Sequence, residues 1–400
     1  MKPRWATIQW REQYYWLLIG LWLVTAASAY LYHLLTQHTF SRVALQLPVI
    51  DLPVYWYGII IMGGILLGAL VVTRLVEIQA RRTLTAVVPA KIRQRPLRRL
   101  HLPETISRQL EGQRLQTIGD LLLVWGIDPA GLGLPAESRE LLAEKLGEQP
   151  GIEAVWLTAA PWRVWNPDHV WSGLVWALIL AVIGARLYHV LTPSPSMAAL
   201  SISSPADYFR HPLQLINIRQ GGLGIYGGIA GGALGLFIFT YRNKIPGWGW
   251  ADLSVIGLAL GQAVGRWGNF INQELYGRPT DLPWAVYIEP IHRLPDYVQF
   301  SHFHPAFLYE SIWSFLSFIF LYWLFQQRAH HLKAGDLTAS YLILYAVGRT
   351  LLEMVRLDSR TVSLGSLDLG LPVATLVSLI IALSMGGWLI WRHRGRQVTG

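Results

Sequence analysis

Cysteine is absent from the 400-residue sequence. Its absence excludes a disulfide framework, a thiolate metal site and a cysteine nucleophile supplied by the chain itself. Any thiol that takes part in chemistry here must therefore come from a partner molecule. The sequence also lacks a long-period repeat and a low-complexity tract.

Charge is scarce as well. Charged residues make up 14% of the chain, against roughly 25% in an ordinary soluble domain. Hydrophobic residues make up 52%, mean hydropathy is +0.34, and 19 tryptophans and 17 tyrosines suit membrane interfaces. We therefore predict an integral membrane protein. Its net charge of +9 then indicates cytoplasmic Lys and Arg near helix ends, with no nucleic-acid partner.

Eight apolar segments reach the ~20 residues that cross a bilayer. They lie near 15–35, 55–77, 170–191, 222–241, 251–268, 307–326, 337–356 and 371–391, and the fifth is the shortest. The predicted fold is an all-α polytopic membrane protein with about eight transmembrane helices. The first segment could instead be a cleaved signal peptide ending at Ala27-Ser28-Ala29. Its length and the aromatic run that follows favour a retained helix.

Lysine and arginine gather at both termini and in the connections near 74–99, 242–244 and 328–333. The positive-inside rule places these parts in the cytoplasm, and an even number of spans keeps both termini there. The remaining connections are then predicted to face outward. They are residues 36–54, 192–221, 269–306 and 357–370.

Residues 95–168 differ from the rest because they are polar and mix both signs of charge. Residues 117–127 and 137–147 predict short amphipathic helices around a Pro/Gly turn. A faint resemblance to helix-hairpin-helix modules suggests nucleic-acid binding, but ten acidic residues between 104 and 168 argue against it. We predict a small soluble helical insert in the cytoplasm with a structural or partner-docking role.

Glycines recur at helical spacing in two of the apolar segments. GLGIYG (222–227) formally matches GxGxxG, but a lipid-compatible helix follows it, so we reject a dinucleotide site. Four-residue spacing instead predicts close helix packing in lipid. The glycines concerned are Gly227, Gly231, Gly235, Gly228, Gly232, and, in the second segment, Gly58, Gly64 and Gly68.

The stretch GRWGNFINQELYGRPTDLPWAV (265–286) is polar although it follows an apolar run. Arg266 and Asn269 share one helix face, and Glu274 and Arg278 follow. Ordinary interface polarity is one explanation. Asn and Gln side chains extend poorly from the membrane to water, however. Ionisable groups at membrane depth usually mark a functional site.

A second cluster is GRTLLEMVRLD (348–358). Arg349, Glu353 and Arg356 fall on one helical stripe. Arg349 and Glu353 can pair, either as a structural salt bridge or within a site. Arg356 is then a surplus positive charge that calls for an anion.

A third group comprises His304 in FHPAFLYES, Tyr57 in YWYG and Arg186 in GARLYHV. His304 could equally be a capping or interface histidine. Across all three clusters, arginines lie near the outer ends of separate spans, and their rigid fork suits phosphate. The residues therefore predict an outward-facing pocket for a phospholipid head group, with no metal and no cofactor.

These motifs closely resemble those of prolipoprotein diacylglyceryl transferases. The resemblance rests on GRWGNFINQELYGRPTDLPWAV, GGLGIYGG, HPAFLYE and GRTLLEMVR, with YWYG and GARLYHV in the first two core helices. It runs from about residue 48 to 391, interrupted by the insert. The family has seven core helices, so this chain adds one before them. The implied division is 1–45 (added helix and outer linker), 46–94 (first core helix and basic flank), 95–168 (insert) and 169–400 (remaining core helices).

The resemblance implies that a diacylglyceryl group moves from phosphatidylglycerol to the lipobox cysteine of a preprolipoprotein signal peptide, which forms a thioether and releases glycerol phosphate. It places the protein in the bacterial inner or plasma membrane, with its site facing outward. The clusters and the resemblance together predict the catalytic residues Arg266, Arg349, Tyr226, Asn269 and Glu274. They predict the substrate-binding residues Arg266, Arg278, Gly277, Tyr57, Arg186, Glu353, Arg356 and His304.

Two positions depart from the family pattern. Tyr226 stands where many members have the histidine that is the usual candidate base, and the phenol of an ordinary tyrosine, with a pKa of ~10, is a poor base. Tyr226 could position the substrate, His304 or Glu274 could take the proton, or the chain could be a weak enzyme that mainly binds phosphatidylglycerol or lipoprotein precursors. Phe307 replaces a frequent Gln, which we interpret as minor. An anion transporter is a further alternative, although charge clusters at the outer ends rather than along the spans.

Overall fold

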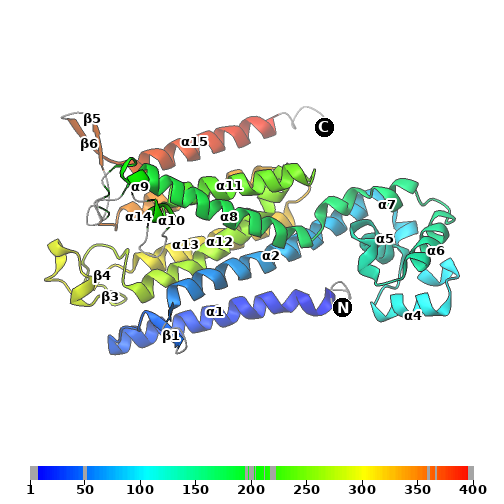
Figure 1. Ribbon diagram of the computed structural model, residues 1–400, viewed down its shortest axis with the longest axis horizontal. Coiled ribbons are helices and arrows are strands. Elements are labelled where there is room, and N and C mark those ends of the chain that lie inside the picture. The colour runs from blue at the N-terminus through cyan, green and yellow to red at the C-terminus, as the bar shows by residue number, and fades with distance from the viewer. Residues whose placement is uncertain are drawn as a thin grey trace. The chain divides into compact units, whose positions relative to one another are not determined.

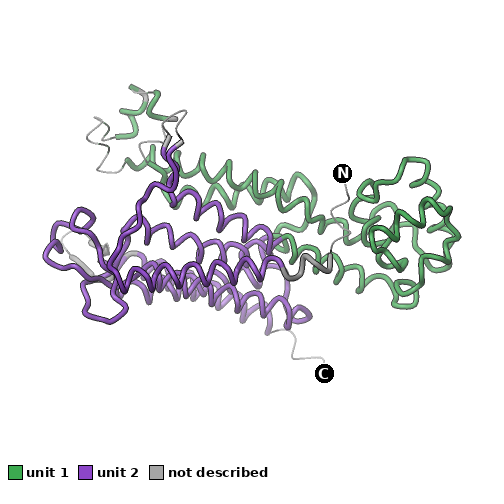
Figure 2. The backbone as a smooth tube through the Cα atoms, turned by 90° about the horizontal axis from the view of Figure 1, so that it is seen from below, with its two compact units in different colours: residues 1–9, 73–250 green, residues 10–72, 251–400 purple. Residues whose placement is uncertain are grey.

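The computed structural model describes residues 8–47, 52–193, 197, 202, 204–210, 212–216, 222–357, 361–364 and 367–394. Helices dominate this part of the chain (Figure 1). The chain divides into two compact units (Figure 2). Unit 1 is Met1–Gln9 with Thr73–Trp250, and unit 2 is Trp10–Val72 with Ala251–Gly400.

Unit 2 combines helices from the N-terminal part of the chain with all of its C-terminal part. Its elements are α1 (Ile8–Thr36), β1 (Val43–Leu47), β2 (Leu52–Tyr55), the first half of α2 (Trp56–Val87), most of α12 (Gly247–Asn272), β3 (Val286–Tyr287), η6 (Pro290–His292), η7 (Pro295–Tyr297), β4 (His302–Phe303), α13 (Ala306–Gln327), α14 (Asp336–Glu353), β5 (Thr361–Leu364), β6 (Leu367–Pro372) and α15 (Val373–His393). The strands form three two-stranded antiparallel sheets, each from consecutive strands.

Unit 1 contains the insert and two long helices. After the second half of α2 come α3 (Ala90–Arg93), η2 (Leu97–Leu100), α4 (Glu104–Gly112), α5 (Ile118–Ile127), η3 (Pro129–Leu132), α6 (Ala136–Gly147), α7 (Ala154–Thr158), η4 (Pro161–Trp165), α8 (Asp168–Leu191), α9 (Asp207–Arg210), α10 (Leu213–Ile216) and α11 (Ile225–Arg242).

The all-α polytopic prediction is confirmed. Among the described residues, five helices are long and apolar enough to cross a membrane: Tyr14–Thr36, Trp56–Val87, Asp168–Leu191, Ala306–Gln327 and Ala374–His393. Helices α11, α12 and α14 occupy the other three predicted positions, but glycine or ionisable residues make them less apolar. The expectation that the fifth segment is short is wrong, because α12 continues at both ends and has 26 residues.

The predicted glycine packing is confirmed at most positions. In unit 1, α8 and α11 run side by side (Figure 1), and a Cβ on Gly227 or Gly231 would lie 2.1 Å from a carbonyl oxygen of α8. In unit 2, a Cβ on Gly68 of α2 would lie 2.6 Å from the Gly257 carbonyl of α12. Gly58 is the exception, since a Cβ there meets nothing within 4 Å.

The two helices predicted in the insert are present, but one differs in character. Helix α5 starts with a capping box, in which Thr117 and Asp120 exchange side-chain-to-backbone hydrogen bonds. Nearly every residue of α5 is buried, so the interpretation of this segment as amphipathic is wrong. Its run of leucines is surrounded by the insert's other helices, with Trp162 Nε1 donating to the Leu122 carbonyl at 3.1 Å.

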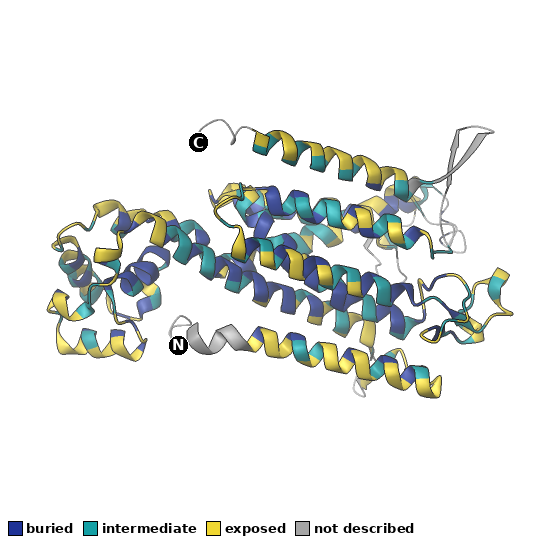
Figure 3. Ribbon diagram, turned by 180° about the vertical axis from the view of Figure 1, so that it is seen from behind, coloured by how far each residue is buried: buried dark blue, intermediate teal, exposed yellow. Residues whose placement is uncertain are grey.

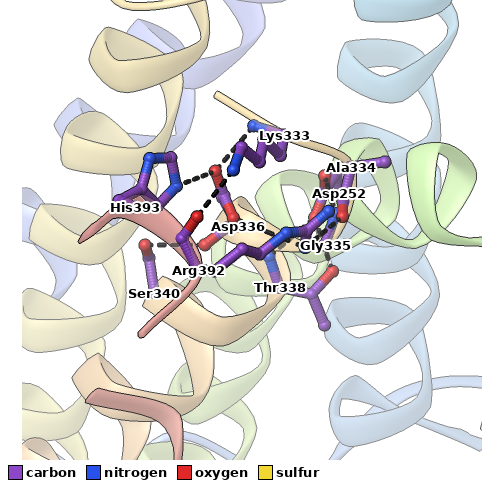
Figure 4. Close-up of polar contacts among 9 residues, drawn as sticks. All are labelled: Asp252, Lys333, Ala334, Gly335, Asp336, Thr338, Ser340, Arg392 and His393. Atoms are coloured by element: carbon purple, nitrogen blue, oxygen red, sulfur yellow. Dashed lines mark hydrogen bonds and ion pairs between the residues drawn. The ribbon is translucent and has the colours of Figure 1, made fainter. Parts of the chain in front are cut away.

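At one end of unit 2, a carboxylate of α12 caps the start of α14 (Figure 4). Asp252 is 7% exposed and accepts hydrogen bonds from the Gly335 amide at 2.6 Å and from the Thr338 amide and hydroxyl at 2.8 and 2.7 Å. Asp336 accepts from His393 Nε2 at 2.9 Å, which ties the end of α15 to the same place. Helix α14 therefore receives its N-terminal cap from another helix.

The opposite end of unit 2 has an aromatic core. Tyr30 of α1, Phe270 of α12 and Phe307 of α13 are buried together with Phe303 of β4. The Phe307 ring stacks on Phe270 at 5.0 Å and lies 5.8 Å from Tyr30. Most of the rest of α1 is exposed (Figure 3). This end of unit 2, from the last turn of α12 to the first turn of α13, is called the loop end below.

Candidate active site

The backbone of the loop end joins three segments that are distant in sequence. The Gly277 amide donates to the His304 carbonyl at 2.9 Å, and the His304 amide donates to the Arg278 carbonyl at 2.9 Å. The Arg278 amide donates to the Val355 carbonyl at 2.8 Å. A Cβ on Gly277 would lie 2.6 Å from that Val355 oxygen, so only glycine fits here. These bonds bring Arg278, His304 and Arg356 into one small region.

A single carboxylate lies between two arginines in this region. Glu310 lies one helical turn after Ala306, the first residue of α13, and its side chain is only 7% exposed. Its Oε2 lies 2.5 Å from Arg266 Nε of α12, and its Oε1 lies 3.4 Å from Arg356 Nη1. The shared carboxylate offsets the repulsion between the two guanidinium groups and fixes their positions.

The predicted pair on α14 is also formed. Arg349 Nη1 lies 2.8 Å from Glu353 Oε2, and the glutamate side chain is 5% exposed. The two opposite charges lie within ion-pair distance of each other, which offsets part of the cost of burying the glutamate.

Amide side chains hold the third predicted glutamate. Asn269 Nδ2 donates to Glu274 Oε1 at 2.8 Å, and Asn272 Nδ2 lies 3.3 Å from the same oxygen. Asn269 is buried, whereas Glu274 and Arg278 are exposed. Tyr57, in the first turn of α2, lies against α12, because a Cβ on Gly268 would be 2.7 Å from its ring. Tyr57 therefore packs against the C-terminal part of α12, directly before Asn269.

His304 belongs to a chain of hydrogen bonds that reaches α1. Its Nδ1 lies 3.1 Å from Tyr309 Oη, which accepts from Trp284 Nε1 at 3.0 Å. The Trp284 carbonyl accepts from Tyr30 Oη at 2.6 Å. The chain explains the position of His304 and links the added helix to the loop end.

The loop itself is anchored by a buried phenol. Tyr276 Oη donates to the His292 carbonyl at 3.0 Å and accepts from the Leu294 amide at 2.7 Å. Burial raises the pKa of Tyr276, while the Leu294 amide and the charge of Arg293 act in the opposite direction. The phenol therefore stays neutral and can keep both hydrogen bonds.

Two of the predicted residues belong to unit 1. Arg186 is buried, and its guanidinium donates to the backbone carbonyls of Leu215, Gly222 and Gln214. It thereby holds the segment that precedes α11. Tyr226 lies in the first turn of α11 and is 67% exposed. A role for either residue toward a substrate stays a prediction.

Glu310 was missing from the sequence-based set of site residues. It belongs to the HPAFLYE motif, but its partners Arg266 and Arg356 are 44 and 46 positions away. A carboxylate within an apolar helix was the available signal, because such groups normally have a charged partner or a function. Among the described residues, no three His, Asp or Glu side chains form a metal-binding group.

Four arginines and three glutamates therefore gather where apolar helices end, with amides, a tyrosine and a histidine beside them. Such a cluster can bind an anion and stabilise negative charge that develops on it. The fold and the cluster together define a helical membrane protein built for an anionic, lipid-soluble ligand.

Comparison with known proteins identifies the class more closely. Residues 152–391 match the family model described as prolipoprotein diacylglyceryl transferase. The chain is 43% identical over 236 residues to the phosphatidylglycerol–prolipoprotein diacylglyceryl transferase of Nostoc sp. (strain PCC 7120), covering 57% of this chain and 77% of that protein. It is 42% identical over 231 residues to the Synechococcus elongatus protein of the same name (56% and 73%), and 37% identical over 247 residues to that of Chloroflexus aggregans (58% and 77%).

The chain belongs to the prolipoprotein diacylglyceryl transferase family. The residues around Glu310 lie within the matched region, whereas α1 and Tyr57 lie before it.

Proposed function

We propose that this protein transfers the diacylglyceryl group of phosphatidylglycerol to a prolipoprotein. Family membership supports the reaction. The structural observation that supports particular residues is the cluster in which Glu310 contacts both Arg266 and Arg356. The acceptor is the cysteine thiol of a lipobox in the signal peptide. The protein lies in the bacterial cell membrane with both termini in the cytoplasm and the loop end facing outward, as the distribution of Lys and Arg supports.

The reaction forms a bond between sulfur and the glycerol carbon that bears the phosphate. The bond between that carbon and the phosphate oxygen breaks, and glycerol phosphate leaves with the bonding electrons. Negative charge therefore grows on the departing oxygen, where a guanidinium contributes more in the transition state than in the ground state. Arg266, Arg349 and Arg356 are the candidates, since each guanidinium carries a permanent positive charge and five N–H donors.

The thiol proton needs an acceptor. Glu310 is a poor choice, because Arg266 and Arg356 occupy its two carboxylate oxygens. Glu274 is exposed but accepts amide hydrogen bonds, and His304 contacts Tyr309 through Nδ1. In our proposal the field of the arginines favours the thiolate of the incoming peptide, Tyr226 positions it, and His304 or Glu274 receives the proton.

The test is a mass measurement on a lipobox peptide incubated with the purified protein and phosphatidylglycerol. The native protein adds the diacylglyceryl mass to the peptide. The Arg266→Ala variant loses at least about a hundredfold in rate, which is the scale for one donor to a developing oxyanion. Arg108→Ala, on the exposed surface of the insert, serves as the control and keeps the native rate. Undiminished transfer by Arg266→Ala would refute this assignment.

A second candidate is a homologue that binds phosphatidylglycerol or lipoprotein precursors with little turnover, which the exposed tyrosine at position 226 favours. Comparison of the native protein with Tyr226→His and Tyr226→Phe separates the two. Transfer by the native protein and by Tyr226→Phe supports the enzyme with a positioning tyrosine. Transfer by Tyr226→His alone supports the binding protein.

A further inference from the structure

We propose that α1, the helix added before the family core, forms a binding groove with α12 and α13 for one acyl chain of the phosphatidylglycerol donor. This inference rests on the proposed function for the identity of the lipid. It concerns a part of the chain that lies outside the matched family region.

The groove is a cavity of about 410 Å³ within unit 2. One wall is a continuous stripe of α1 that includes Ala26, Ala27 and Leu31. The facing wall includes Trp267 of α12 and Ile312 and Leu316 of α13. The stripe runs from Trp22 to Leu34, about 18 Å at 1.5 Å per residue. Both its volume and its length suit a hydrocarbon chain, since ligand sites commonly enclose about 300–1,000 Å³.

Large side chains hold α1 away from α13 at both ends of the groove. Toward the start of α1, Tyr15 Oη lies 3.0 Å from Tyr322 Oη, and the Trp16 ring lies 5.3 Å from that of Tyr322. Toward its end, Tyr30 packs against Phe270 and Phe307. The small residues Ala26 and Ala27 lie between these two aromatic contacts, so the helices cannot close the space between them.

The chemistry of the lining excludes a polar ligand. Almost all of the lining surface is carbon, and its two hydroxyls, those of Tyr30 and Ser311, already have hydrogen-bond partners. Tyr30 Oη donates to the Trp284 carbonyl at 2.6 Å. Ser311 Oγ donates to the Ala263 carbonyl at 2.7 Å and accepts from Trp267 Nε1 at 3.1 Å. Neither hydroxyl is left to guide a head group into the groove, whereas an alkyl chain needs no hydrogen bond.

The groove adjoins the candidate active site. Trp267 directly follows Arg266, and Ser311 directly follows Glu310, so the groove and the ion pair lie on neighbouring faces of the same two helices. The hydrogen bond from Trp267 Nε1 to Ser311 Oγ joins α12 and α13 between the groove and the ion pair. A lipid whose phosphate reaches Arg266 is therefore placed to lay a tail along α1. This continuity favours the donor lipid over the surrounding bilayer as the occupant.

The first experiment is photolabelling of the full-length protein in vesicles that contain phosphatidylglycerol with a diazirine in one acyl chain. We expect labels to concentrate on the groove residues Ala27, Leu31 and Ile312 rather than on Leu21, which faces away from the groove and is 64% exposed. Excess unlabelled phosphatidylglycerol suppresses this labelling. Uniform labelling around α1, unaffected by competitor, would mean that the helix contacts only bulk lipid and would overturn the inference.

Two matched variants provide a functional readout. Ala27→Trp fills the groove, and Leu21→Trp places the same side chain on the opposite face of α1. For Ala27→Trp we expect KM for long-chain phosphatidylglycerol to rise about threefold to tenfold with kcat unchanged. The effect is modest because a tail that leaves the groove for the bilayer loses packing but no hydrophobic free energy. Leu21→Trp retains the native KM. Ile312→Trp, which fills the groove from α13, replaces Ala27→Trp if that variant does not fold.

The outcomes for the two proposals are distinguishable. Focused labelling without transfer to a lipobox peptide would preserve the groove and refute the transferase. Transfer with uniform labelling, or with equal KM values for Ala27→Trp and Leu21→Trp, would preserve the transferase and refute the groove.

Discussion

At the scale of single residues, Glu310 has the central position in the cluster. Its side chain contacts both Arg266 and Arg356, and it is almost fully buried. Removing one member of a buried charge pair leaves the other charges uncompensated, at a cost of about 3–5 kcal/mol. Glu310 therefore organises the arginines rather than reacting with the substrate.

We accordingly predict that Glu310→Gln lowers transfer to the lipobox peptide by about tenfold to a hundredfold and also lowers the midpoint of thermal unfolding in detergent. The neutral amide keeps the shape but no longer balances two guanidinium groups. Glu111→Gln, on the exposed surface of the insert, is the control and should leave both quantities unchanged. A native rate in Glu310→Gln would contradict the organising role.

Gly277 gives a second prediction at this scale. An added methyl group would lie 2.6 Å from the Val355 oxygen and 2.9 Å from His304 Cβ, so Gly277→Ala must move the segments that the loop joins. We expect a loss of about 1–3 kcal/mol in unfolding free energy and a slower transfer rate. Gly386→Ala in α15, where a Cβ meets nothing within 4 Å, should be neutral or slightly stabilising. Equal behaviour of the two variants would show that the loop can relax around the methyl group.

At the scale of elements, the sequence predicts the long helices well because apolar runs of this length have few other solutions. It predicts their ends less well, since α12 continues through glycines and polar residues at both termini. Helix α5 was misjudged because a short apolar run has the same pattern in a buried helix and at an interface. The sequence does not predict the pairing of Arg266 with Glu310, because that contact depends on how α12 and α13 pack and not on residue spacing within either helix.

The cap that α12 supplies to α14 is testable at this scale. Asp252 accepts three hydrogen bonds at the N-terminus of α14, where a negative charge is also favoured by the helix dipole. We predict that Asp252→Asn lowers the unfolding free energy by about 1–3 kcal/mol, measured by thermal unfolding in detergent. Asp296→Asn, in the loop of unit 2, is the control. A native midpoint for Asp252→Asn would show that the amide caps α14 equally well.

At the scale of the whole molecule, the distribution of charge predicts which parts face the cytoplasm. The lack of native cysteine makes this easy to measure, since a single introduced cysteine is the only thiol present. We predict that Ile291→Cys, 84% exposed in the loop of unit 2, reacts with a membrane-impermeant maleimide added to intact cells. Glu111→Cys in the insert should react only after the membrane is permeabilised. The reverse pattern would invert the proposed orientation and place the loop end in the cytoplasm.

Helices α12 and α14 are fastened to each other near both of their ends. Asp252 binds the start of α14, and the backbone around Gly277, which follows α12, is hydrogen-bonded to Val355, which follows α14. Slow amide hydrogen exchange should therefore be lost from both helices in one cooperative opening, with a common free energy, rather than by fraying from either terminus. On this basis the two helices behave as one rigid body during turnover, and the motions that admit lipid and peptide belong to the elements around them.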